Sequence, residues 1–113
     1  MYWNRINEID ASELVRWLQD SESNLRIIDV RQPGEIAAGT VPGAEPMPLQ
    51  TLPLRMDELD RKQKLVFICR TGARSAQACM FLQQQGYENV LNLRGGVTAW
   101  AQTGQPFALP QAV

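Results

Sequence analysis

Residues 64–86, KLVFICRTGARSAQACMFLQQQG, contain the pattern that decides the fold class. The apolar run LVFI ends at Cys69 and predicts a buried β-strand. A tight loop follows, in which Gly72 permits the backbone angles of a sharp turn. The next residues have the apolar spacing of a helix, which Gly86 ends. The stretch is therefore predicted to be a strand–loop–helix unit.

The same alternation continues on both sides of this unit. Short strands are predicted in RINEI (5–9), LRIIDV (25–30) and NVLNL (89–93). Helices are predicted in ASELVRWLQD (11–20), PGEIAAG (33–39), TLPLRMDELD (51–60) and GGVTAWAQTG (95–104), and the proline-rich VPGAEPMPL (41–49) is predicted to be an extended loop. Alternating strands and helices predict an α/β fold with a mostly parallel sheet.

The helix predicted over residues 11–20 has a recognisable N-cap and an apolar face. Asp10 is a candidate N-cap, and Glu13 stands three residues later at the spacing of a capping box. Leu14, Trp17 and Leu18 are predicted to line one face of the helix.

The composition excludes several classes of protein and site. A chain of 113 residues with 44% hydrophobic residues fits one domain with a real core. Histidine is absent, which removes Cys–His and Ser–His catalytic pairs and most zinc sites. Two cysteines do not make a disulfide framework. With no signal-peptide pattern and no apolar run long enough for a bilayer, we expect a cytoplasmic protein without membrane contact.

Charge is unevenly distributed along the chain. Residues 1–60 hold 11 of the 12 acidic residues and five of the 11 basic ones, so they carry −6, and residues 61–113 carry +5. Five basic residues and no acidic one lie between positions 61 and 74, around Cys69. This local field favours a small anionic ligand rather than a nucleic acid, because no basic stripe with interleaved aromatic residues is present.

Cys69 is the candidate nucleophile. Ligands of open α/β sheets bind beyond the carboxyl ends of the strands, where Cys69 is predicted to lie. Backbone N–H groups of the loop, the following helix N-terminus, and Arg70 and Arg74 all favour thiolate over thiol. They would also stabilise a charged adduct on the sulfur. The alternative is an inert buried cysteine beside solvent-facing arginines.

Three blocks of the chain together form a recognisable pattern. They are IIDVRQPGEIAAGTVPGA (27–44), CRTGARS (69–75), and LRGGVTAW with GQP within residues 93–106. In this order the blocks resemble the first signature, the catalytic loop and the closing signature of the rhodanese-like single-domain sulfurtransferases. The resemblance covers nearly the whole chain. It implies a single rhodanese domain over residues 1–113, with a core of about 5–106 and a tail at 107–113.

The resemblance also implies a fold and an activity. The fold would be a five-stranded, mostly parallel central sheet with helices on both faces. Cys69 would take a sulfane sulfur from a donor such as thiosulfate and pass it, through a persulfide, to cyanide, a thiol or a protein cysteine. A protein persulfide could also be the donor. Neither metal nor organic cofactor is implied, and we expect a monomer. The loop that would bind the substrate consists of Arg70, Thr71, Gly72, Ala73 and Arg74.

Three residues of the first signature, Asp29, Arg31 and Glu35, are candidates for the rim of the site. They would organise the loop or its entrance, or Arg31 and Glu35 would form a structural or solvated ion pair. The family commonly has histidine where this chain has Thr40, and an aromatic residue where it has Ile36. We expect both departures to be structural.

Two alternative functions remain open at this stage. Cysteine phosphatases also hold a thiolate in an anion-binding loop, but typically with five residues between cysteine and arginine, whereas four separate Cys69 from Arg74. A non-catalytic interaction module is the second alternative; some rhodanese-like domains that lack the cysteine serve this role, whereas the cysteine, the glycine and the loop length are all present here. Cys79 is predicted to be a structural residue rather than a redox partner of Cys69, because it lies more than a helical turn away from the loop.

Overall fold

The structure, a computed structural model, describes residues 6–20 and 22–110. Its centre is a five-stranded parallel sheet with the strand order β1-β5-β4-β2-β3. The strands are β1 (Glu8–Ile9), β2 (Leu25–Asp29), β3 (Glu45–Pro46), β4 (Lys64–Ile68) and β5 (Val90–Leu93). The predicted α/β class is confirmed, and the sheet is parallel throughout. The part of the first predicted strand at position 5, and the end of the tail, lie outside the described residues.

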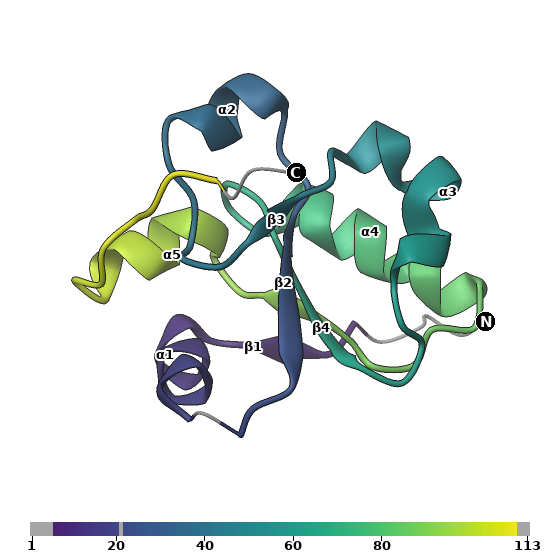
Figure 1. Ribbon diagram of the computed structural model, residues 1–113, viewed down its shortest axis with the longest axis horizontal. Coiled ribbons are helices and arrows are strands. Elements are labelled where there is room, and N and C mark those ends of the chain that lie inside the picture. Colours follow the sequence, from purple (N-terminus) through teal and green to yellow (C-terminus); the bar gives the residue numbers. More distant parts are fainter. Residues whose placement is uncertain (1–5, 21, 111–113) are drawn as a thin grey trace.

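Helices cover both faces of the sheet, as Figure 1 shows. α1 (Ala11–Gln19) and α5 (Gly96–Gln102) lie on one side, and α3 (Leu52–Arg55) and α4 (Ala73–Gln84) lie on the other. α2 (Pro33–Ala37) lies beyond the carboxyl end of β2. The arrangement places the loops after β2 and β4, together with α2, at one end of the sheet.

The hydrophobic core is accordingly divided by the sheet into two parts. Leu52, Ala78 and Leu82 pack with Phe67 on the side of α3 and α4. Leu14 and Trp100 pack with inward-facing residues of β2, β4 and β5 on the other side. β4 lies in the middle of the sheet and is buried on both faces from Leu65 to Ile68, as its continuous apolar run predicts.

Three local predictions need correction. The segment predicted as an extended loop contributes the edge strand β3, whose Pro46 is tolerated because an edge strand needs fewer ladder donors. The helix predicted over 51–60 is only one turn, flanked by 3₁₀ turns at Leu49–Thr51 and Met56–Glu58. Leu18 is 40% exposed, so the buried face of α1 is narrower than its sequence spacing indicates.

The predicted start of α1 is confirmed. Asp10 is the N-cap, and its carboxylate accepts a hydrogen bond from the Glu13 backbone N–H at 2.8 Å. α4 begins directly after the glycine of the loop. Gly72, with φ +108°, is its N-cap, and Ser75 lies in the first turn.

Candidate functional site

Cys69 follows β4 directly, at the carboxyl end of the central strand of the sheet. Its residue surface is only 1% exposed. The neighbouring strand β2 is still paired at this level, because the Val30 N–H donates to the Ile68 carbonyl at 3.0 Å. The thiol therefore lies at the base of the loop that joins β4 to α4.

The loop turns its hydrogen-bond donors toward the sulfur. The Gly72 N–H donates to Cys69 Sγ at 3.0 Å, and the Ser75 hydroxyl lies 3.3 Å from the same atom. Gly72, whose N–H faces the sulfur, has φ +108°, a conformation that residues with a Cβ adopt only with strain. Backbone N–H groups of the loop face the thiol, an arrangement of the kind that suits a negative charge.

These donors control the ionisation of the thiol. Burial by itself raises the pKa of Cys69, because it disfavours the charged form. Hydrogen bonds from the Ser75 hydroxyl, and from the backbone N–H groups of Ser75, Gly72 and Thr71, lower it. The hydrogen bonds prevail, and the pKa of Cys69 lies below its ordinary value. The site thus favours a thiolate without any imidazole.

The N-terminus of α5 supports the loop from the other side. The Val97 N–H donates to the Cys69 carbonyl at 2.9 Å, and the Thr98 N–H donates to the Arg70 carbonyl at 3.2 Å. Close approach of these segments depends on Gly96, since a Cβ there would lie 2.6 Å from the Arg70 carbonyl oxygen. Gly96 is the first residue of α5, so the absence of a side chain there lets the start of the helix approach the loop.

Arg74 pairs with Glu35 of α2 rather than pointing freely into the loop. Its two terminal nitrogens lie 2.8 and 2.9 Å from the two carboxylate oxygens, a bidentate geometry. The hydrogen bonds from Arg74 are the main reason that the pKa of Glu35 falls to about 2. The pair neutralises much of the charge that the sequence assigns to the loop, and it ties α2 to α4.

The alternative of an Arg31–Glu35 ion pair is wrong, because Arg31 is engaged elsewhere. Its Nη2 lies 2.8 Å from Asp29 Oδ2 and donates to the Gly39 carbonyl at 2.7 Å. Asp29 is completely buried and also accepts a hydrogen bond from the Thr40 hydroxyl at 2.7 Å. Thr40, which stands where the family commonly has histidine, is thus part of a buried polar cluster that anchors the turn after β2.

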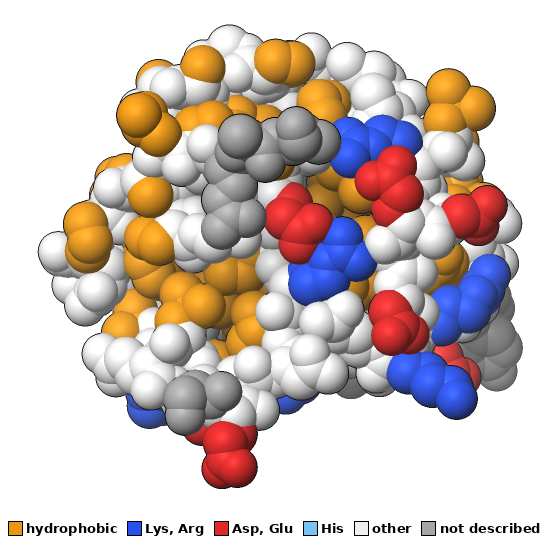
Figure 2. Space-filling view, viewed as in Figure 1, with side chains coloured by type: hydrophobic (Ala, Val, Ile, Leu, Met, Phe, Trp, Pro, Cys, Tyr) orange, Lys and Arg blue, Asp and Glu red, His pale blue; other side chains and the backbone are white. Residues whose placement is uncertain are grey.

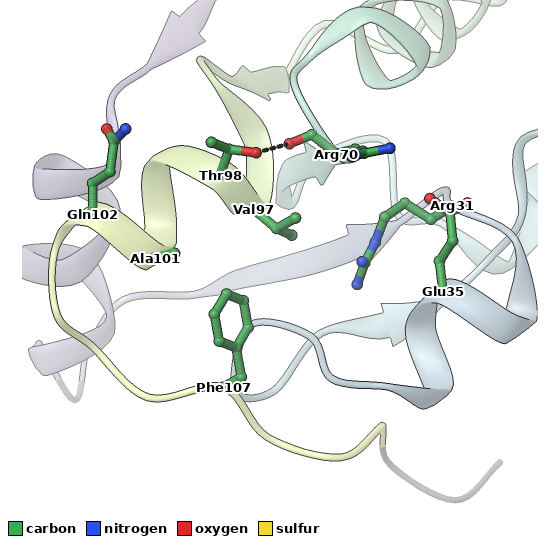
Figure 3. A pocket seen from close by; sticks show the side chains of 8 residues that line it. All are labelled: Arg31, Glu35, Arg70, Val97, Thr98, Ala101, Gln102 and Phe107. Atoms are coloured by element: carbon green, nitrogen blue, oxygen red, sulfur yellow. Dashed lines mark hydrogen bonds between the residues drawn. The ribbon is translucent and has the colours of Figure 1, made fainter.

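A cavity of about 690 Å³ opens beside the loop. Figure 3 shows Arg70, Arg31 and Glu35 on one side of it, and residues of α5 and the tail on the other. Val97, Ala101 and Phe107 give that second side an apolar surface. Figure 2 shows basic and acidic side chains next to one another over the middle of this view and toward α3, with hydrophobic side chains gathered over the half in which α5 lies.

Arg70 differs from the other two arginines near the loop. Its residue surface is exposed, and among the described residues no hydrogen bond or ion pair engages its guanidinium. It lines the cavity together with Arg31 and Glu35. Among the described residues, Arg70 therefore brings a positive charge without an ion-pair partner to the cavity. Asp29, which was predicted to lie at the rim of the site, is instead buried beneath Arg31.

Sequence reasoning missed a polar chain behind the thiol. The Ser75 hydroxyl bonds to Asn92 Oδ1, and Asn92 Nδ2 donates to Glu8 Oε2 at 2.9 Å and to the Gly72 carbonyl at 3.2 Å. Ser75 and Asn92 are both buried. A signal was present in NVLNL, where an amide side chain interrupts an otherwise apolar strand, but its partner could not be identified from the sequence.

Cys79 is buried in the core below α4 and is not disulfide-bonded. Burial, with a smaller contribution from the charge of Glu8, raises its pKa to about 12. In the part of the chain that the structure describes, no cluster of His, Cys, Asp or Glu side chains has the arrangement of a metal site. No helix there has both the length and the apolar character needed to cross a bilayer.

Comparison with known proteins gives consistent matches. Residues 10–103 match the family model described as a rhodanese-like domain. A sulfurtransferase of Allochromatium vinosum is 48% identical over 94% of this chain and 98% of its own length. The thiosulfate sulfurtransferase GlpE of Pseudoalteromonas translucida is 35% identical over 66% of this chain and 70% of its own. The crystal structure of a rhodanese-related protein from Thermoplasma volcanium is similar with a TM-score of 0.81 and 31% identity, covering 91% of this chain and 98% of that one.

Proposed function

Because the chain belongs to the rhodanese-like domain family and is a sulfurtransferase, we propose that it transfers sulfane sulfur through a persulfide on Cys69. The observation that carries this proposal is the arrangement of donors around one buried sulfur. The Gly72 N–H and the Ser75 hydroxyl both reach Cys69 Sγ, and the pKa of the thiol is lowered. Donors in this position favour a thiolate nucleophile and can also stabilise charge on a sulfur attached to it.

The proposed reaction has two displacement steps. The Cys69 thiolate attacks the outer sulfur of thiosulfate, and sulfite leaves with the electron pair of the broken S–S bond. Cys69 then carries a persulfide whose negative charge lies on the outer sulfur. In the second step an acceptor thiolate, or cyanide, attacks that outer sulfur, and the Cys69 thiolate leaves with the electron pair. Electrons and charge balance without a cofactor.

Arg70 and the cavity bear on the donor and the acceptor. The guanidinium of Arg70, which no side chain in residues 6–20 and 22–110 pairs with, lies beside the loop and suits an anionic donor such as thiosulfate. The cavity of about 690 Å³ is much larger than thiosulfate and has an apolar wall that includes Phe107. A larger thiol or the persulfide of a protein cysteine would therefore also fit. The GlpE similarity supports thiosulfate as the first donor to test. We place the protein in the cytoplasm, as a monomer.

Intact-mass measurement tests the proposal directly. Incubation of the reduced protein with thiosulfate should add the mass of one sulfur atom, and cyanide or a thiol should remove it. Cys69→Ala should gain no sulfur, whereas Cys79→Ala, which removes the other cysteine, should gain it normally. Failure of the wild-type protein to gain sulfur from thiosulfate and from an organic persulfide would support the interaction-module alternative.

The phosphatase alternative receives a separate test. The loop has four residues between Cys69 and Arg74, and Arg74 is held by Glu35 in a bidentate ion pair. An arginine engaged in this way is less available to a phosphoryl group. Turnover of a phosphotyrosine mimic that disappears in Cys69→Ser would favour phosphatase activity over sulfur transfer.

A further inference from the structure

The polar chain behind Cys69 contains a competition for one proton. Ser75 Oγ lies within hydrogen-bonding reach of both Cys69 Sγ and Asn92 Oδ1. A serine hydroxyl has a single proton to donate, so it cannot donate to both acceptors at the same time. All three groups are buried, so water does not substitute for either partner.

The orientation of the Asn92 amide is set by its other contacts. Its Nδ2 faces the Glu8 carboxylate at 2.9 Å and the Gly72 carbonyl at 3.2 Å, and both of these groups can only accept. The amide nitrogen must therefore point toward them, which leaves Oδ1 facing Ser75. Arg94 Nε in turn lies 3.2 Å from the second oxygen of Glu8, which keeps that carboxylate in place at the edge of the sheet.

We propose that Asn92 is a positioning residue for the transfer reaction. Its Oδ1 is a second acceptor for the Ser75 hydroxyl proton, so that Ser75 donates to Cys69 Sγ only while that sulfur carries negative charge. The inference rests on the proposed role of Cys69 as nucleophile. When Cys69 is a thiol, or when the charge has moved to the outer sulfur of a persulfide, Ser75 donates to Asn92 instead.

The competition has a chemical consequence for both steps. Cys69 must attack in the first step and leave in the second, and these demands oppose each other, because a thiolate of lower pKa leaves more readily but attacks more weakly. Asn92 takes the hydroxyl proton away from the sulfur when no charge is present. It therefore holds the pKa of Cys69 above the value that Ser75 alone would produce.

A double-mutant cycle on the pKa of Cys69 tests this role. Asn92→Leu removes the competing acceptor at similar side-chain volume, so the pKa of Cys69 should fall by about 0.5–1 unit, the equivalent of one net hydrogen bond. Ser75→Ala should raise the pKa. In the Ser75→Ala background, Asn92→Leu should have no effect, since no hydroxyl remains to be shared.

The cycle separates positioning from a structural role. These substitutions leave the charged groups on the elements around the loop unchanged, so their effects on the pKa of Cys69 cancel in the cycle. The groups are Arg70, Arg74, Glu35, Asp29, Arg31 and Glu8. If Asn92 only held the Gly72 carbonyl in place, Asn92→Leu would displace the Gly72 N–H and raise the pKa of Cys69 in both backgrounds. That result, or an equal shift in both backgrounds, overturns the proposal.

A second measurement needs no substitution at Asn92. The side-chain carbonyl carbon of Asn92 in labelled wild-type protein should change its NMR shift as Cys69 ionises, with the same midpoint. In Ser75→Ala this titration should disappear, and a flat Asn92 signal in the wild type contradicts the proposal. Neither readout requires turnover, so a failure here is distinct from failure of Cys69 to carry sulfur.

Discussion

Substitution of Gly96 by alanine tests whether the contact between α5 and the loop is tight. Gly96 has φ +57°, and a residue with a Cβ at such an angle costs about 1–2 kcal/mol. The new Cβ would also lie 2.6 Å from the Arg70 carbonyl oxygen and would overlap the Cys69 carbonyl oxygen. Both atoms belong to the backbone, so the loop or the helix must move.

The movement endangers two backbone hydrogen bonds. Both bonds join α5 to the loop after β4. In one the Val97 N–H donates to the Cys69 carbonyl at 2.9 Å, and in the other the Thr98 N–H donates to the Arg70 carbonyl at 3.2 Å. At about 1 kcal/mol for each, together with the backbone strain, the total cost is about 3–4 kcal/mol. This would be a large part of the stability of an ordinary domain, about 5–15 kcal/mol.

Gly104→Ala is the matched control. Gly104 also has a positive φ, +79°, but no atom in the described part of the chain lies within 4 Å of its Cβ position. It should therefore cost only the backbone strain, about 1–2 kcal/mol. Urea unfolding gives the free energy of unfolding of both variants. Intact mass after thiosulfate treatment shows whether the loop still lets Cys69 take up sulfur. Gly96→Ala should lose about 2 kcal/mol more than the control and should load sulfur more slowly. Equal losses in the two variants, with normal sulfur loading, would refute the tight contact.

Three further predictions concern charge and thiol reactivity. Arg70→Ala should raise the apparent KM for thiosulfate several-fold and weaken its dependence on salt, because no acidic group among the described residues pairs with the guanidinium beside the cavity. The stability contributed by Glu35, whose pKa is lowered from 4.5 to about 2 mainly by Arg74, should be complete above pH 4.5 and should be lost as the pH falls toward 2. Because both side chains are about one-third exposed, this contribution should be at most about 1 kcal/mol in unfolding experiments. At neutral pH, iodoacetamide should alkylate Cys69 in the folded protein and leave Cys79 unmodified, because burial raises the pKa of Cys79 to about 12.

Each of these predictions has a control. Arg16→Ala, on the exposed face of α1, should leave the KM for thiosulfate unchanged, and an unchanged KM in Arg70→Ala would remove Arg70 from the substrate path. In Glu35→Gln the acid-dependent loss between pH 4.5 and 2 should shrink, and an identical pH profile would contradict the assigned ion pair. Alkylation of Cys79 at the rate of Cys69, measured by peptide mass, would contradict its burial.

Local signals in the sequence were sufficient for much of the fold. The apolar run before Cys69 predicts a central strand because a strand buried on both faces needs continuous apolar residues. Asp10 predicts the start of α1 because its carboxylate can reach an unpaired N–H within three residues. The edge strand β3 was not predicted, since two residues that pair only at one edge have no periodicity to read.

The candidate site was only partly predictable, because some of its contacts join residues far apart in the chain. Cys69 and its turn at Gly72 follow from residues adjacent in the chain. The partner of Arg74 could not be predicted in this way, because Glu35 is 39 positions away and nothing in the sequence distinguishes it from the other acidic residues. For Arg31 the sequence left two roles open, one of them an ion pair with Glu35, and only the structure shows that Arg31 pairs with the buried carboxylate of Asp29, which it shares with Thr40.

Periodicity and turn chemistry act over a few residues, so the amino-acid sequence was sufficient to predict that a thiol ends a buried strand and is followed by a glycine turn and a helix. Which groups surround that thiol depends on how distant segments pack together. Only the strand order, with β1 beside β5, brings Glu8 to Asn92 across 84 positions and sets Asn92 against Ser75. Hydrogen bonds and ion pairs act over a few ångströms whatever the separation along the chain, so the electrostatics of Cys69 depend on the fold and not on the loop alone.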